Sequence, residues 1–154
     1  MFGEGVYLAE DGAKADQYTR DADAIFQTSS DGPLAALHKL LYPEGTLPSP
    51  GVNYMFLCRV GLGCPIRTQD GKTCLDAGAA TNGKLFATNR RKQLGEIASS
   101  TEPKVPFHSL LVELGVNVAR FREIVVFDGA RVYPEYLLAY SRLRNSGEPE
   151  PEPA

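Results

Sequence analysis

Several patterns are missing from this 154-residue chain, and each absence excludes a class of protein. The 16 lysines and arginines do not outnumber the 19 aspartates and glutamates, so a net charge of −3 offers no basic footprint for DNA or RNA. No apolar run approaches the roughly 20 residues that a membrane-spanning helix needs. The opening residues Met1–Gly5 lack the basic and apolar regions of a secretory signal. We therefore expect an intracellular protein, nuclear or cytoplasmic, that neither spans a membrane nor binds nucleic acid through bulk charge.

Metal-binding patterns are also scarce. The three cysteines, Cys58, Cys64 and Cys74, are odd in number and form no Cys-x-x-Cys pair. His38 and His108 lie far apart in the sequence and add no ligand pattern. The spacing therefore predicts free thiols of a reducing compartment and no metal site.

The most informative stretch that is present is 121–128, whose β-branched and aromatic residues predict a strand. Asp128-Gly129 is a turn signal, so the run 131–142 is expected to form the second strand of a hairpin. Because side chains alternate between faces of a strand, Glu123 shares its face with apolar residues such as Val125. A carboxylate is costly to bury there unless it is hydrogen-bonded or takes part in chemistry. The simpler interpretation is a glutamate at a strand end that faces solvent.

The remaining periodicity predicts three more strands and two helices. Short strands are expected at 6–9 and 107–112, and a strand at 54–62 is apolar on both faces apart from Arg59, which favours a central position in a sheet. The two helices are expected at 13–20, capped by Asp11, and from Pro33 onward, where leucines form one apolar stripe. In the final strand Pro134 cannot donate a ladder hydrogen bond, which predicts an edge or a bulge. Five strands, mostly antiparallel, with two helices predict an α+β domain.

The bend at 2–5 opens the chain. Gly3 and Gly5 permit backbone angles that other residues avoid and let a ligand approach the backbone closely, although a tight turn is the commoner reason for two spaced glycines. No Gly-Lys-Ser/Thr sequence follows, which excludes a P-loop. On the helix expected after this strand, Lys14 and Tyr18 are four residues apart and would share one face.

Three segments carry little periodic signal. The stretch 21–51 is expected to be a surface excursion that contains the helix at Pro33. The polar stretch 66–106 is long for a connection inside one domain, and such connections are more often functional than idle. Its basic cluster 90–92 is compatible with a phosphate or an acidic partner, but three adjacent charges are most often a solvated face. The acidic, proline-rich stretch 144–154 is expected to be a disordered tail.

A series of segments, taken in order, resembles the catalytic domain of poly(ADP-ribose) polymerases, and the tankyrase-like branch most closely. The matching segments are Met1–Glu10 with Lys14–Tyr18, Phe56–Gly63, His108-Ser109, Arg122–Asp128 and Tyr133–Leu137. Together they cover nearly the whole of 1–143, which would be the C-terminal part of such a domain. The resemblance implies the ADP-ribosyltransferase fold, a split antiparallel β-sheet with few helices that clamps NAD⁺ as a substrate.

The resemblance also implies roles for individual residues. Glu123 matches the catalytic glutamate, which accepts a hydrogen bond from the 2′-hydroxyl of the nicotinamide ribose and helps to polarise an acceptor hydroxyl. Tyr7 matches the tyrosine of the family's His-Tyr-Glu triad and would pack against the nicotinamide, and Tyr18 would stack on the other side of the ring. Breaking the glycosidic bond makes an oxocarbenium-like centre that a carboxylate stabilises, while aromatic faces orient the departing ring. The other positions matched to the NAD⁺ site are Lys14, Ala15, Phe2 and Gly3.

The chain departs from the family pattern in three respects. The family's triad histidine and the glycine after it lie upstream of the match, so we expect an N-terminally truncated domain, with Met1 either an internal methionine of a longer protein or the start of a truncated gene product. Ala15 stands where the family usually has a serine that hydrogen-bonds the nicotinamide carboxamide, and one such bond is worth about 1 kcal/mol. The zinc ligands of the tankyrase-like branch also have no counterpart.

Two functional hypotheses follow from the resemblance and these departures. The first is an NAD⁺-dependent ADP-ribosyltransferase that releases nicotinamide and modifies side chains of acceptor proteins, itself among them, with single units or with poly(ADP-ribose). The second is a truncated, catalytically silent module that binds NAD⁺ or serves an interaction.

Overall fold

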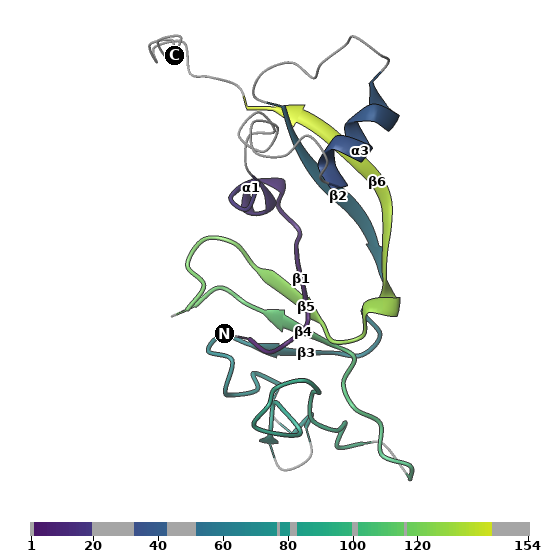
Figure 1. Ribbon diagram of the computed structural model, residues 1–154. Coiled ribbons are helices and arrows are strands. Elements are labelled where there is room, and N and C mark those ends of the chain that lie inside the picture. The colour runs from purple at the N-terminus through teal and green to yellow at the C-terminus, as the bar shows by residue number, and fades with distance from the viewer. Residues whose placement is uncertain are drawn as a thin grey trace. The chain divides into compact units, whose positions relative to one another are not determined.

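The computed structural model describes residues 2–19, 33–42, 52–76, 78–80, 83–99, 102–115 and 117–142 (Figure 1). These ranges contain six β-strands and two α-helices, which confirms the predicted α+β class. In chain order the elements are β1 (Val6–Ala9), α1 (Gly12–Asp16), α3 (Pro33–Leu41), β2 (Val52–Val60), β3 (Pro65–Thr68), β4 (Ser109–Val112), β5 (Glu123–Val126), the 3-10 helix η2 (Gly129–Arg131) and β6 (Val132–Ser141). The predicted tail at 144–154 and most of the predicted excursion lie outside the described residues.

The strands form two sheets, one of four strands in the order β1-β5-β4-β3 and one of two strands, β2 and β6. In the larger sheet β5 pairs antiparallel with both β1 and β4, whereas β3 and β4 are parallel. The chain divides into two compact units, the first made of Met1–Gln17 with Leu57–Tyr136 and the second of Tyr18–Phe56 with Leu137–Ala154. The larger sheet belongs wholly to the first unit, and the division between units falls within β2 and β6.

The hydrophobic core of the described residues lies in the first unit, around the inner strands of the larger sheet. Its buried members are Phe2, Ile66, Ala80, Leu85, Leu94, Phe107, Leu110, Val112, Val118 and Val125. All four residues of β5 are buried, as expected for a short apolar strand with neighbours on both sides. Because each buried aliphatic side chain contributes roughly 1.5–3 kcal/mol, this packing fixes the strand on which Glu123 lies.

Helix α1 begins where the sequence predicts and ends earlier. The Asp11 side chain accepts a 2.8 Å hydrogen bond from the Ala13 N–H, so the predicted N-cap is confirmed. The helix was expected to run to residue 20 but ends at Asp16, where the Gln17 N–H bonds to the carbonyl of Lys14 and tightens the last turn. Tyr18 therefore lies beyond the helix, and the predicted helical face shared with Lys14 does not form.

Helix α3 begins at Pro33, as the fixed φ of proline at a first helical position predicts. Its C-terminal leucines do not form a buried stripe within the second unit, since Leu40 is 83% exposed and Leu41 is also exposed. No helix in the described ranges is long and apolar enough to cross a membrane. The three cysteines are free thiols, as their spacing predicts.

The predicted hairpin of 121–128 with 131–142 is wrong. Asp128 caps the 3-10 helix η2 through a 3.0 Å hydrogen bond from the Ala130 N–H, and β5 and β6 belong to different sheets. The reason is that β5 already has β1 on one side and β4 on the other, which leaves it no free edge for β6. A turn signal between two strand patterns does not show that the two strands pair.

The central position predicted for the strand at 54–62 is also wrong. This strand, β2, pairs within the described part of the chain with β6 alone, and Phe56 and Leu57 are 65% and 53% exposed. Apolar residues on both faces of a strand do not show that the strand is buried, because a strand with an exposed apolar face has the same pattern. Pro134 lies on β6, which has one free edge within this two-stranded sheet, and this confirms the predicted edge position.

The long connection 66–106 holds more structure than its polarity suggests. Strand β3 was missed because its apolar signal is short: only Ile66 and Thr68 face the core, and Arg67 lies between them. The rest is joined by isolated bridges that pair Thr73 with Lys84, Ala80 with Ile97, Phe86 with Leu94 and Glu96 with Pro106. These bridges bring the scattered apolar residues of the connection into the core, where Leu85 and Leu94 are buried.

Candidate active site

Glu123 is the first residue of β5 and lies between two neighbouring strands. It is opposite Ala9 of β1 on one side and opposite Val112 of β4 on the other. Only 9% of the residue is exposed, so the interpretation of a glutamate that faces solvent is wrong. A buried carboxylate needs a compensating partner, and the helix that follows β1 supplies it.

That partner is Lys14 of α1. Its Nζ lies 2.9 Å from the Glu123 Oε1, and the two side chains are 19% and 11% exposed. The Asp11 cap fixes the start of α1 and thereby the position of Lys14, while the sheet fixes Glu123. Opposite charges at this distance compensate each other's loss of hydration, so the pair holds a carboxylate in a defined orientation at a site with little water.

Tyr7 lies on β1, opposite Val125, and its hydroxyl closes the N-terminal bend. The hydroxyl donates to the Gly3 carbonyl at 2.8 Å and accepts from the Phe2 N–H at 3.1 Å. Gly3 has a φ of +106°, and a Cβ there would lie 2.7 Å from the Phe127 ring, so only glycine fits. The Phe2 side chain is buried in the core, and any contact of Phe2 with a cofactor must therefore come from its backbone.

The other two predicted positions, Ala15 and Tyr18, belong to different units. Ala15 follows Lys14 in α1 and is partly exposed. Tyr18 belongs to the second unit and is 76% exposed. The structure thus brings Lys14 to Glu123 and joins Tyr7 to the Phe2-Gly3 bend.

Arg122 precedes Glu123 in the chain and was not singled out as a site residue by the sequence. Its Nη2 and Nε donate to the two carboxylate oxygens of Glu10 at 2.6 and 2.9 Å, and its Nη1 lies 3.4 Å from Glu113. The hydrogen bonds from Arg122 lower the pKa of the Glu10 carboxyl, and those to Glu10 raise the pKa of the guanidinium. This bidentate pair ties the end of β1 to the residue before Glu123. The adjacency of Arg122 and Glu123 was the available signal, but the partner Glu10 is 112 positions away.

The family match extends over nearly all of this framework. A sequence model of the poly(ADP-ribose) polymerase catalytic domain matches residues 1–142. The chain belongs to this family. Membership implies the ADP-ribosyltransferase class of enzyme, with NAD⁺ as substrate and proteins as acceptors. Comparison with curated proteins gives no match. Among the residues that the structure describes, no three His, Cys, Asp or Glu side chains form a group able to hold a metal ion.

Proposed function

We propose that this chain is an NAD⁺-dependent ADP-ribosyltransferase with Glu123 as its catalytic residue. The observation that carries the proposal is the ion pair of the buried Glu123, at the start of β5, with the partly buried Lys14. In the reaction, the bond between the nicotinamide nitrogen and ribose C1′ breaks, and neutral nicotinamide leaves with the bonding electrons. An acceptor oxygen or nitrogen then forms the new bond to C1′ and gives up its proton to the solvent.

Glu123 has two tasks in this scheme. Its negative charge stabilises the positive charge that develops at C1′ in an oxocarbenium-like transition state, where water is scarce and electrostatic interactions are strong. A carboxylate beside the ribose can also accept a hydrogen bond from the 2′-hydroxyl and polarise an incoming acceptor hydroxyl, which is the step that chain elongation requires. Lys14 acts as a positioning residue, because its ammonium fixes Oε1 at 2.9 Å.

The aromatic and small residues complete the proposed donor site. Tyr7 would hold one face of the nicotinamide ring, and 44% of this residue is accessible to a ligand. Gly3 allows a ligand to approach the backbone of the bend that the Tyr7 hydroxyl closes. The acceptors are proposed to be protein side chains, including those of the chain itself.

A second candidate function, a catalytically silent NAD⁺-binding module, is favoured by Ala15. This methyl group cannot make the hydrogen bond to the carboxamide that a serine would make. Losing one such bond weakens NAD⁺ binding by about tenfold at most if the carboxamide remains solvated. The two candidate functions therefore differ more in the rate of nicotinamide release than in the affinity for NAD⁺.

The decisive experiment compares nicotinamide release and incorporation of labelled ADP-ribose by the wild-type chain, Glu123→Gln and Glu135→Gln. Glu135 is the matched control, since it also pairs with a cation, Arg59, but lies on β6. We expect Glu123→Gln to lower both rates by about a hundredfold or more and Glu135→Gln to leave them unchanged. Ala15→Ser should tighten NAD⁺ binding by several-fold.

Other outcomes choose between the candidates. NAD⁺ binding by the wild-type chain without nicotinamide release, and without a gain in turnover in Ala15→Ser, would support the silent module. A chain that neither binds nor cleaves NAD⁺ would contradict both candidates.

A further inference from the structure

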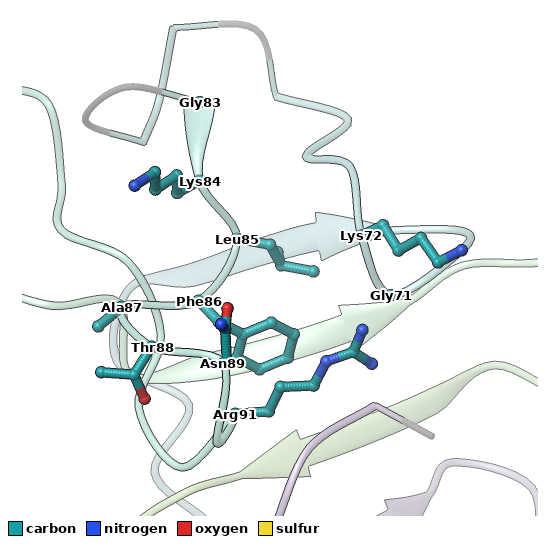
Figure 2. Close-up of a pocket in the computed structure, with 10 residues that line it drawn as sticks. All are labelled: Gly71, Lys72, Gly83, Lys84, Leu85, Phe86, Ala87, Thr88, Asn89 and Arg91. Carbon is teal, nitrogen blue, oxygen red and sulfur yellow. The ribbon is translucent and has the colours of Figure 1, made fainter.

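A pocket of about 560 Å³ opens in the first unit at a place that the proposed reaction does not use (Figure 2). Its lining comes from the turn after β3 and from the stretch 83–91 of the long connection. The lining residues are Gly71, Lys72, Gly83, Lys84, Leu85, Phe86, Ala87, Thr88, Asn89 and Arg91. None of them is a residue proposed for NAD⁺. A volume of this order suits a nucleotide-sized ligand.

The pocket is positively charged in a chain that is negatively charged overall. Lys72, Lys84 and Arg91 contribute three positive charges, and none of the described residues that line the pocket is acidic, whereas the whole chain carries −3. A cleft lined by one sign of charge concentrates ligands of the opposite sign. The chemistry of the lining therefore selects an anion.

Arg91 is held in a conformation that non-glycine residues rarely adopt. Its φ is +51°, its N–H donates to the Thr88 carbonyl at 3.1 Å, and its carbonyl accepts the Glu4 N–H at 3.0 Å. The guanidinium lies 5.5 Å from the centre of the Phe86 ring, which packs edge-on against Phe127. A left-handed backbone that persists at a non-glycine residue is often associated with function. At Arg91 this backbone conformation places the planar guanidinium group beside the Phe86 ring.

The backbone of Lys72 is fixed independently, by the turn after β3. The Asp70 Oδ1 accepts hydrogen bonds of 2.8 Å from the N–H groups of Lys72 and Thr73, and its other oxygen accepts from the Thr73 hydroxyl. These bonds hold the pKa of the Asp70 carboxyl far below its usual range and occupy its oxygens, so this nearby acid is already engaged within its own turn. Figure 2 shows the side chains of Lys72 and Arg91 extending toward the same side of the view, and Lys84 toward the other.

We propose that this pocket binds the diphosphate group of a nucleotide, with Arg91 and Lys72 as its principal contacts. The fork of an arginine matches two phosphate oxygens, and a lysine adds a mobile point charge beside it. Asn89 and Thr88 offer hydrogen bonds to a ribose or base, and Phe86, which is partly exposed, offers apolar surface. The choice of ADP-ribose as the ligand rests on the proposed function, because that reaction attaches diphosphate-bearing groups to acceptors. The pocket would then hold the product and not the donor.

The test is a titration of the full ¹⁵N-labelled chain, followed through its backbone amide signals, with ADP-ribose, ADP, inorganic pyrophosphate and AMP. We expect saturable shifts at residues 71–72 and 83–91 with the three diphosphates and binding weaker by about tenfold with AMP, which has one phosphate fewer. Amides near Tyr7 and Glu123 report the donor site in the same spectra, so failure of the pocket and failure of the proposed function are seen separately.

The variant Lys72→Gln/Arg91→Asn removes both charges, and asparagine tolerates the left-handed backbone at 91. We expect it to weaken ADP-ribose binding, measured at residues 71–72 and 83–91, by about tenfold or more. Arg90→Gln is the control, since Arg90 is exposed and adjacent but does not line the pocket; it should change binding by less than about twofold. Lys72→Gln alone serves if the double variant does not fold. The proposal is wrong if no saturable shift occurs at residues 71–72 and 83–91 at about 1 mM ligand, if AMP binds as well as ADP, or if Arg90→Gln weakens binding as much as the double variant.

Discussion

Lys14 and Glu123 depend on each other for their burial, because each alone would be a charge with little water around it. Replacing Lys14 by Met keeps the apolar stem and removes the ammonium group. We expect Lys14→Met to lower the free energy of unfolding by about 1–3 kcal/mol, since the carboxylate loses its partner. The double variant Lys14→Met/Glu123→Gln, which leaves no charge at either position, should recover most of that loss.

Urea denaturation of the wild-type chain, the two single variants and the double variant measures this coupling. A coupling energy near zero, with the two single losses simply adding, would contradict the mutual dependence. The same Lys14→Met protein separates stability from activity: a positioning residue should lower the rate of nicotinamide release even at temperatures where the variant is fully folded.

At the scale of an element, the turn that follows β3 makes a pH-dependent contribution to stability. Asp70 accepts hydrogen bonds from two backbone N–H groups and from the hydroxyls of Thr68 and Thr73, and these lower its pKa in the folded protein. A carboxyl whose folded-state pKa lies below its unfolded value stabilises the fold above the unfolded pKa, which is near 3.9, and loses that contribution as the pH falls. Asp70→Asn removes the titrating group and keeps an oxygen that can accept the same N–H groups.

We therefore expect Asp70→Asn to be less stable than the wild-type chain above about pH 5, and the difference in unfolding free energy to shrink as the pH falls toward about 2. Chemical denaturation at a series of pH values measures this difference, in which the titration of other groups cancels. A difference that stays constant over this range would show that the charge of Asp70 does not stabilise the turn. Because the turn carries Lys72, the variant should also weaken binding at the proposed diphosphate pocket.

The sequence correctly predicted elements whose position depends on neighbouring residues. Asp11 as a cap, Pro33 as a first helical residue and the strand of Glu123 each follow from residues within a few positions. The predictions were wrong where the pairing of a strand depends on residues far away in the sequence. The partners of β5 are β1 and β4, which excludes the hairpin with β6, and no local pattern records that choice.

The same limit applies to the candidate site. The resemblance to a family pointed to Glu123 and Lys14, but their 2.9 Å contact requires a helix and a strand more than a hundred residues apart to meet. The bidentate contact of Arg122 with Glu10 is equally distant in sequence and was not predicted. Residue types at the site could be read from the sequence, whereas the pairs that they form could not.

At the scale of the whole molecule, buried apolar surface is unevenly distributed between the two units. Every buried hydrophobic residue among the described ones belongs to the first unit, including the inner strands β4 and β5. Within the described part of the second unit, Asn53 is buried, while Leu40 and Leu41 of α3 are exposed. Since apolar burial is the main favourable term in folding, the described part of the second unit holds little stabilisation of its own.

This distribution predicts where the backbone opens first. Amides of β4 and β5 have neighbouring strands on both sides and a buried apolar setting, so they should exchange with solvent only through global unfolding. Amides of α3 should exchange at least about a hundredfold faster, through local opening that costs less free energy. Native-state hydrogen exchange followed by NMR measures both sets in one sample. Equal protection of α3 and β5 would mean that the two units unfold as one cooperative body, and the stabilisation of the second unit would then have to come from contacts other than its own apolar core.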